Sequence, residues 1–378
     1  MSKIKNTGCG CKNSRLNKVG GQAVLEGVMM KAGEKTVTTC RKEDGSLFVN
    51  DATFVSVRRK HKILNIPILR GIINFVEMMI LSVKTMNASA EALGLEDEES
   101  KTEKWMKKHL GIGITSVVIG LGVILGVALS LFLFMFLPNL ISSLIDKYLA
   151  HGNLGLWTAV IEGFLKIVIF LVYLFLVSLM PDIKRTFMYH GAEHKSIACF
   201  ESGEELTPEN AKKHTRFHPR CGTSYMFFMI LLGIFAGLFV KMIFTNLNTF
   251  AYTGIRLAIL PIVMGLGYEV IMLAGKHENL FTKILSAPGL WVQRITTKEP
   301  TLEMLEVAIV SIKCALRDDF PEFRTFYENK EWEKAPASSE ATNGFVADNE
   351  KNETQTLSEE QPVAEHINAD ENEQNEAL

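Results

Sequence analysis

The stretch LGIGITSVVIGLGVILGVALSLFLFMFL, Leu110 to Leu137, carries no charged side chain. A helix that crosses the hydrocarbon core of a bilayer needs about 20 predominantly apolar residues, because each residue advances the helix by about 1.5 Å. This segment exceeds that length. The sequence therefore predicts a protein embedded in a membrane rather than an ordinary soluble fold.

Three further segments meet the same requirement of length and apolar composition. They are Leu156–Met180, Ser224–Phe244 and Ile255–Ala274. The chain of 378 residues is 47% hydrophobic even though its ends are polar. We therefore expect an α-helical polytopic membrane protein, with about four transmembrane helices and a small cytosolic α+β part.

The Lys and Arg residues between the predicted spans set the expected orientation, because short cytoplasmic loops retain positive charge. The first loop, Pro138–Gly155, holds one of them, the second loop, Pro181–Gly222, holds seven, and the third loop, Thr245–Gly254, holds none. This alternation predicts a multi-pass protein of the inner, cytoplasmic membrane. Both termini and the second loop are expected in the cytoplasm.

The segments outside the spans show regular patterns of their own. Gln22–Lys60 alternates polar and apolar residues around an Asp44-Gly45 turn signal, which predicts a small β-hairpin region. Ile63–Leu93 has polar residues at helical spacing, which predicts an amphipathic helix on the inner membrane face or against the bundle. Thr301–Leu316 has a helical apolar pattern behind Pro300. We expect one composite cytosolic domain from both ends of the chain.

The two ends of the chain differ in charge. The N-terminus is basic but lacks the apolar core of a signal peptide. Ala335–Leu378 holds eleven acidic residues against one Lys and has no apolar periodicity, so we expect it to be disordered. The six cysteines form no regular framework, and disulfides are not expected. The expected parts are 1–19, 20–62, 63–109, 110–180, 181–222, 223–275, 276–333 and 334–378.

The stretch YHGAEHK, Tyr189–Lys195, holds the motif H-x-x-E-H, formed by His190, Glu193 and His194. On a helix the two histidines project from one face, because they are four residues apart, and they can bind one metal ion. Glu193 lies beside them, where a carboxylate can act as a general base. The order of residues is the inverse of the H-E-x-x-H helix of zinc hydrolases. The motif predicts a zinc site.

Further candidate ligands follow in the sequence. KHTRFHPRCG, Lys213–Gly222, contains His214, His218 and Cys221 at spacings common in metal sites. Glu269 lies in the fourth predicted span, where an ionisable group is costly and indicates a function. We expect the site to be completed from this set.

Each of these residues has a structural alternative. The histidines could be solvated polar residues at the membrane surface, and Glu269 could form a salt bridge with Lys166 or Arg256 within the bundle. Glu162 is expected to pair with Lys166 four residues later. Weaker candidates for metal ligation are His277, Cys9 and Cys11.

Two glycine-containing segments also stand out. GGQAVLEGVMMK, Gly20–Lys31, predicts a β-strand whose paired glycines allow a tight turn or a close backbone approach, with a bulge at Glu26-Gly27. Direct participation in a site is the less favoured interpretation. The glycines within Gly111–Gly126 are expected to allow close helix packing.

Four motifs in this order resemble the YqhQ-like family of bacterial membrane proteins. They are GGQAVLEGVMMK, HGAEHK, RFHPRCGTS and TTKEPTLEMLEVAI. The resemblance covers roughly Lys18–Tyr327. That family is of unknown function and is described only as a predicted metal-dependent enzyme. The resemblance implies that a predicted metal site is formed by His190, Glu193, His194, His214, His218 and Cys221.

Two functions from different classes fit these features. The favoured one is a cytosol-facing, membrane-embedded zinc hydrolase, with a peptidase as the favoured subclass; His190 and His194 would be ligands, and the third ligand would be His214, His218, Cys221 or Glu269. The alternative is a membrane adaptor whose metal is structural and which recruits a cytosolic partner. The number of protein ligands separates them, because a structural zinc has four and a catalytic zinc has three.

The expected partners follow from these hypotheses. They are the lipid bilayer and a cytosolic protein or peptide substrate, and a homo-oligomer is compatible with the pattern. No nucleic acid is expected. A transporter is less favoured, because four spans leave little room for a pathway without oligomerisation.

Overall fold

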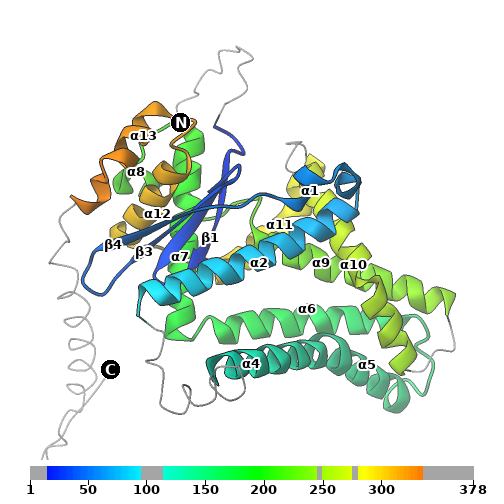
Figure 1. Ribbon diagram of the computed structural model, residues 1–378. Coiled ribbons are helices and arrows are strands. Elements are labelled where there is room, and N and C mark those ends of the chain that lie inside the picture. The colour runs from blue at the N-terminus through cyan, green and yellow to red at the C-terminus, as the bar shows by residue number, and fades with distance from the viewer. Residues whose placement is uncertain (1–14, 95–113, 245–248, 275–279, 335–378) are drawn as a thin grey trace, which may run out of the picture. The chain divides into compact units, whose positions relative to one another are not determined.

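The computed structural model describes residues 15–94, 114–244, 249–274 and 280–334 (Figure 1). The strands are β1 (Val19–Val24), β2 (Gly27–Ala32), β3 (Lys35–Arg41) and β4 (Leu47–Thr53). The helices before the third candidate span are α1 (Val57–Lys60), η1 (Lys62–Asn65), α2 (Leu69–Ala92), α4 (Ile114–Leu131), η2 (Phe132–Phe136), α5 (Leu137–Tyr148), α6 (Trp157–Val177), α7 (Pro181–Ser202) and α8 (Pro208–Lys213). The remaining helices are α9 (Gly222–Ile243), α10 (Thr249–Ala274), α11 (Leu280–Thr296), α12 (Leu302–Ala315), α13 (Pro321–Glu328) and η3 (Glu331–Glu333).

The four strands form an antiparallel sheet in which each strand pairs with the next in sequence. Val24 lies opposite Gly27, so the residues between them form a two-residue turn, with φ of 47° at Glu26. The predicted bulge at Glu26-Gly27 is therefore wrong: the alternation breaks there because the chain reverses direction. The predicted Asp44-Gly45 turn does join β3 to β4, with φ of 80° at Gly45.

The sheet buries both of its faces (Figure 1). Val28, Met30 and Val37 pack in one core with α7 and α12. Met29, between the first two, points to the other face and packs with Leu81 of α2. Helices α7 and α12 thus cover one face and α2 covers the other, which explains why β2 is a continuous apolar run rather than an alternating one.

Four helices in the described ranges are long and apolar enough to cross a membrane. They are Leu121–Tyr148, Trp157–Val177, Gly222–Ile243 and Ala251–Val270. Large apolar side chains on them are uncovered by the rest of the chain, such as Phe164, which is 66% exposed, and Phe239, which is 64% exposed. Such a surface is favourable in lipid and costly in water. A mostly helical chain with four candidate spans and an N-terminal sheet agrees with the predicted class.

The first candidate span differs from the prediction in two ways. The chain after Leu137 was expected to be a loop, but α5 continues to Tyr148. The π-helical segment η2 ends two residues before Pro138, and a π-helical turn loosens the hydrogen-bond ladder that a proline would otherwise break. The expected close packing at glycines is also absent at two positions of α4: a Cβ on Gly122 or Gly126 would meet no other described atom within 4 Å.

The predicted amphipathic helix is present as α2, and it packs against α10. A Cβ on Gly265 would lie 2.5 Å from the backbone carbonyl oxygen of Ile68, so the two backbones cross too closely for a larger residue. Arg70 of α2 donates to the two carboxylate oxygens of Glu269 through two guanidinium nitrogens. Glu269 thus has a salt-bridge partner on α2, where the sequence had indicated Lys166 or Arg256.

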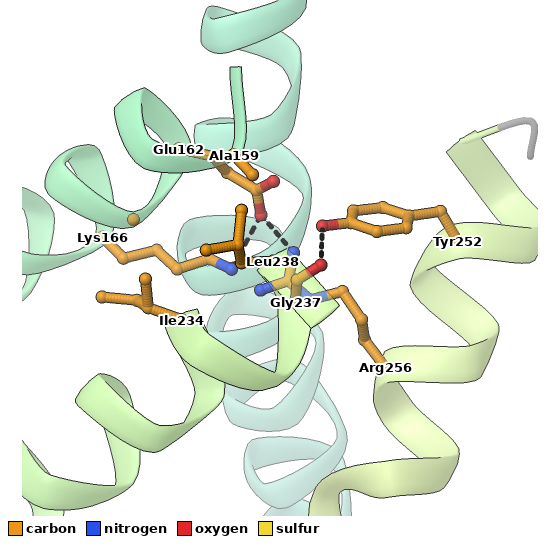
Figure 2. A pocket seen from close by; sticks show the side chains of 9 residues that line it. Ala159, Glu162, Lys166, Ile234, Gly237, Leu238, Tyr252 and Arg256 are labelled. Carbon is orange, nitrogen blue, oxygen red and sulfur yellow. Dashed lines mark hydrogen bonds and ion pairs between the residues drawn. The ribbon is translucent and has the colours of Figure 1, made fainter. Parts of the chain in front are cut away.

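Buried charges join the spanning helices α6 and α10 beside α9 (Figure 2). Glu162 accepts from Lys166 across 2.7 Å, as predicted, and Arg256 of α10 donates to the same oxygen. The Glu162 and Lys166 side chains are only 3% and 8% exposed. A Cβ on Gly237 of α9 would lie 3.1 Å from the Arg256 guanidinium carbon, so the glycine makes room for the arginine. The hydroxyl of Tyr252 donates to the Gly237 carbonyl at 3.1 Å.

Candidate metal centre

Helix α7 carries the H-x-x-E-H motif. It begins at Pro181, whose fixed φ suits the first helical position, and it ends before Gly203, which has a φ of 83°. The helix packs against β1, β2, α8 and α12, which buries almost all of its second half. The second predicted loop is therefore largely helical, and the two histidines of the motif lie on one face with their ring centroids 4.4 Å apart.

The hydrogen bonds of the two rings determine which nitrogen of each is available. Nδ1 of His190 lies 2.9 Å from the Thr296 carbonyl oxygen, and Nδ1 of His194 lies 2.6 Å from the Arg216 carbonyl oxygen. A carbonyl oxygen can only accept, so Nδ1 carries the proton in both rings. Nε2 of each ring then keeps its lone pair. Metal-binding histidines commonly show this arrangement, because the second hydrogen bond fixes the tautomer and the ring orientation.

Cys221 completes a group of three candidate ligands. It caps the start of α9, and its sulfur lies 3.2 Å from Nε2 of His190. A ring nitrogen of each histidine and this sulfur all lie within 4.8 Å of one another. Donor atoms in a tetrahedral zinc site are about 3.3–3.8 Å apart, given metal–ligand bonds of about 2.0–2.3 Å. The donor types fit a zinc ion, which would replace the proton shared by the sulfur and the ring nitrogen and would bring the three donor atoms to this spacing.

Glu193 lies beside this group without belonging to it. Its carboxylate oxygen Oε2 is 4.0 Å from Nε2 of His190, and the residue is only 5% exposed. Burial raises the pKa of Glu193 from 4.5 to about 7, although His190 and a hydrogen bond from the Gly21 backbone N–H both act to lower it. Gly21 is required here, because a Cβ on it would lie 3.2 Å from the Glu193 side chain and 2.5 Å from the Met29 carbonyl oxygen.

His218 lies next to the group but is turned toward a different partner. Its ring centroid is 5.5 Å from that of His194, and its Nε2 is 3.9 Å from the Glu201 carboxylate. Burial lowers the pKa of His218, while Glu201 acts to raise it. The buried amide of Gln293 holds the backbone of His218 by accepting from its N–H at 2.8 Å and donating to its carbonyl at 2.7 Å.

The other predicted ligands lie elsewhere. His214 groups with Cys199 and Glu204 rather than with His190. Glu269 is ion-paired with Arg70 of α2. His277, Cys9 and Cys11 lie outside the described residues.

Several supporting residues could not be identified from the sequence pattern. The carbonyl groups of Thr296 and Arg216 carry no side-chain signal, and Gln293 is a fully buried amide among other polar residues of α11. Among these supporting residues, Gly191 inside the motif is the one that the sequence could have indicated. A Cβ on it would lie 2.0 Å from the Lys298 carbonyl oxygen, so the chain after α11 docks on α7 only at a glycine.

Comparisons with known proteins place this site in a family. Residues 66–318 match the family model described as a protein of unknown function (DUF1385), and this range contains His190, Glu193, His194 and Cys221. The uncharacterized protein YqhQ of Bacillus subtilis (strain 168) is 37% identical over 310 residues, which cover 79% of this chain and 92% of that protein. No solved structure matches the chain. The chain therefore belongs to the DUF1385 family of proteins of unknown function, and it is a YqhQ-like protein as its motifs indicated.

Proposed function

We propose that this protein is a zinc-dependent hydrolase of the bacterial cytoplasmic membrane, with its site on the cytosolic side. His190, His194 and Cys221 would hold the ion, and Glu193 would act as the general base. One observation supports this proposal more strongly than the others. Both histidines donate Nδ1–H to backbone carbonyl groups, which leaves a lone pair on each Nε2, and a ring nitrogen of each lies within 4.8 Å of the Cys221 sulfur.

The ligand count favours catalysis over a structural role. Structural zinc sites have four protein ligands, whereas catalytic sites have three and leave a position for water or substrate. Zinc supplies Lewis acidity in such a site and lowers the pKa of bound water to about 7. Glu193 is held by the Gly21 N–H in a largely water-free environment beside His190, where it can take up and return a proton.

The place of the motif along the chain favours a substrate close to the membrane. Helix α7 begins four residues after the candidate span Trp157–Val177 ends, and His190 is nine residues into it. His194 is four residues farther along, and thirteen helical residues extend about 20 Å, so both histidines lie within that distance of the first residue of α7. We propose a peptide bond in a segment next to the inner membrane face as the substrate class.

A second function is favoured by the burial of the group. His194 is 2% exposed and Cys221 is 8% exposed. A metal ion there would join α7 to the start of α9, as a structural zinc would. The protein would then be a membrane adaptor that presents its cytosolic domain to a soluble partner.

A comparison of cellular protein N-termini separates the two functions. Three strains are compared with wild-type cells: one without the gene, one with Glu193→Gln and one with His190→Ala. A peptidase predicts a set of N-termini in wild-type cells that is lost equally from all three strains, because the amide keeps the size of Glu193 but cannot take a proton. Glu209→Gln, at an exposed position of α8, is the matched control and should keep the set.

The adaptor predicts a different pattern. Glu193→Gln would then behave like wild-type cells, while His190→Ala would behave like cells without the gene. Zinc content of the purified variants completes the test, since Glu193→Gln should retain the metal under either function. Loss of zinc from Glu193→Gln would make Glu193 a ligand and would contradict its role as the base.

A further inference from the structure

We propose that Cys199, Glu204 and His214 form a second metal site, which joins the C-terminal end of α7 to the residue after α8. The sulfur, a carboxylate oxygen and a ring nitrogen of these residues all lie within 4.8 Å of one another. Thiolate, imidazole and carboxylate are the three side-chain groups that bind zinc in proteins. None of these residues serves in the site built from His190, His194 and Cys221.

An unsatisfied polar atom supports this site. Nε2 of His214 is buried and has no hydrogen-bond partner among the described residues. The nearest carboxylate oxygen, Oε2 of Glu204, lies 3.4 Å away. A buried nitrogen without a hydrogen bond destabilises the folded state, because it has lost its contact with water. A metal ion held between these two side chains and the sulfur would satisfy the nitrogen.

The backbone around His214 is held in place independently of any metal. The ammonium group of Lys195, on α7, donates to the His214 carbonyl at 2.8 Å and to the Lys212 carbonyl at 3.0 Å. The hydroxyl of Thr207 caps the start of α8. These contacts position the imidazole opposite the sulfur before an ion arrives, which favours binding.

The second site is separate from the first, although both use α7. Cys199 follows His194 by five residues, which places it about 7.5 Å farther along the helix axis and about 140° around it. One ion cannot reach both groups with bonds of about 2.0–2.3 Å. His214 therefore belongs to a centre of its own, even though its spacing to His218 and Cys221 had grouped it with the first.

The exposure of the three residues indicates how an ion would enter. Cys199 is fully buried, the His214 side chain is 20% exposed and the Glu204 side chain is 47% exposed. Solvent thus reaches the site from the carboxylate side. A bound ion would tie down the connection between α7 and α8, in which Glu204 lies.

Zinc stoichiometry tests this proposal. Full-length, untagged protein with Cys9→Ser and Cys11→Ser is stripped with a chelator and dialysed against Zn²⁺, and bound metal is measured by mass spectrometry. We expect two equivalents in this background, and one after His214→Ala, Cys199→Ser or His190→Ala. His190→Ala combined with His214→Ala should leave none. His151→Ala, which removes an exposed histidine, is the control and should keep two.

A milder variant guards against misfolding. Glu204 is half exposed, so Glu204→Gln should fold normally and should weaken binding of the second equivalent by at least about tenfold, the scale seen even for outer-shell changes. One equivalent that is lost with His190→Ala and unaffected by His214→Ala and Glu204→Gln would overturn the second site alone. One equivalent that is lost with His214→Ala and kept with His190→Ala would support the second site and contradict the proposed function.

Discussion

At the scale of single residues, two hydrogen bonds determine which nitrogen atoms of the motif histidines can bind a metal ion. Thr296 and Arg216 accept from Nδ1 of the two motif histidines, and this fixes a tautomer in which each Nε2 carries a lone pair. Neither acceptor contributes a side chain, so replacing either residue would leave the carbonyl group in place. The tautomer is therefore a property of the fold around α7 rather than of any substitutable neighbour.

Gly191 provides a prediction for a single residue. Gly191→Ala would put a Cβ 2.0 Å from the Lys298 carbonyl oxygen, and backbone cannot retreat as a flexible side chain can. We expect a loss of about 1–3 kcal/mol in the free energy of unfolding, measured as a lower thermal midpoint of the purified protein in detergent.

The control for this prediction is Gly233→Ala in α9. A Cβ there meets no other described atom within 4 Å, so the midpoint should stay the same or rise, since alanine favours helix by about 0.5–1 kcal/mol. Equal midpoints for the two variants would show that the chain after α11 does not dock on Gly191.

The sequence predicted side-chain donors but not their grouping. The spacing of His190 and His194 on a helix was sufficient to place both on one face, and Cys221 was among the candidate third ligands. His214 was assigned to the same set because it is near in sequence, yet its ring lies with Cys199 and Glu204, farther along the chain than His190. Spacing along the chain does not determine side-chain direction outside a regular helix.

At the level of helices and strands, the close contacts depend on glycine and on charge. Gly265 allows the backbone before α2 to lie against α10. Gly237 and Gly21 leave room for the side chains of Arg256 and Glu193, respectively. Helical periodicity, of polar residues in α2 and of apolar residues in α12, predicted that both helices exist, because it directly reflects which face is buried. It gave no information about the crossing points, since these depend on which residues of two distant helices meet.

The buried charges of the spanning helices allow a prediction for helix packing. Glu162→Ala would leave Lys166 and Arg256 without their carboxylate in an apolar environment. We expect a loss of about 3–5 kcal/mol in stability, the usual cost of breaking a buried ion pair from one side. Thermal midpoints in detergent measure this change.

The matched variant replaces all three charged side chains with methionine. Methionines of similar volume remove both the unpaired charges and their desolvation cost, so this variant should be closer in stability to the wild type than Glu162→Ala is. A triple variant less stable than the single one would mean that the ion pairs stabilise the bundle in their own right.

The orientation in the membrane is a prediction for the whole molecule. The three predicted loops hold one, seven and no Lys or Arg residues, in chain order. This distribution predicts that the segment with α7 and α8 faces the cytoplasm. Native Cys199 is fully buried and would not report on this, so exposed positions are required. Asn153 lies in the first predicted loop and Glu209 in the second, and both residues are exposed.

Labelling with a membrane-impermeant thiol reagent tests the orientation. With Cys9 and Cys11 replaced by Ser, Asn153→Cys should react in intact cells from which the outer envelope barrier has been removed. Glu209→Cys should react only after the cytoplasmic membrane is permeabilised. The reverse pattern would place the metal group outside the cell and would contradict a cytosolic substrate.

The most direct test of the account is the zinc X-ray absorption spectrum of protein that carries His214→Ala and one equivalent of zinc. Two histidines, Cys221 and one water predict a single sulfur at about 2.3 Å and nitrogen or oxygen atoms at about 2.0–2.1 Å. Cys221→Ser should abolish the sulfur signal, while Glu193→Gln should leave the spectrum unchanged. A shell without sulfur, or one with several sulfur atoms, would contradict the proposed centre.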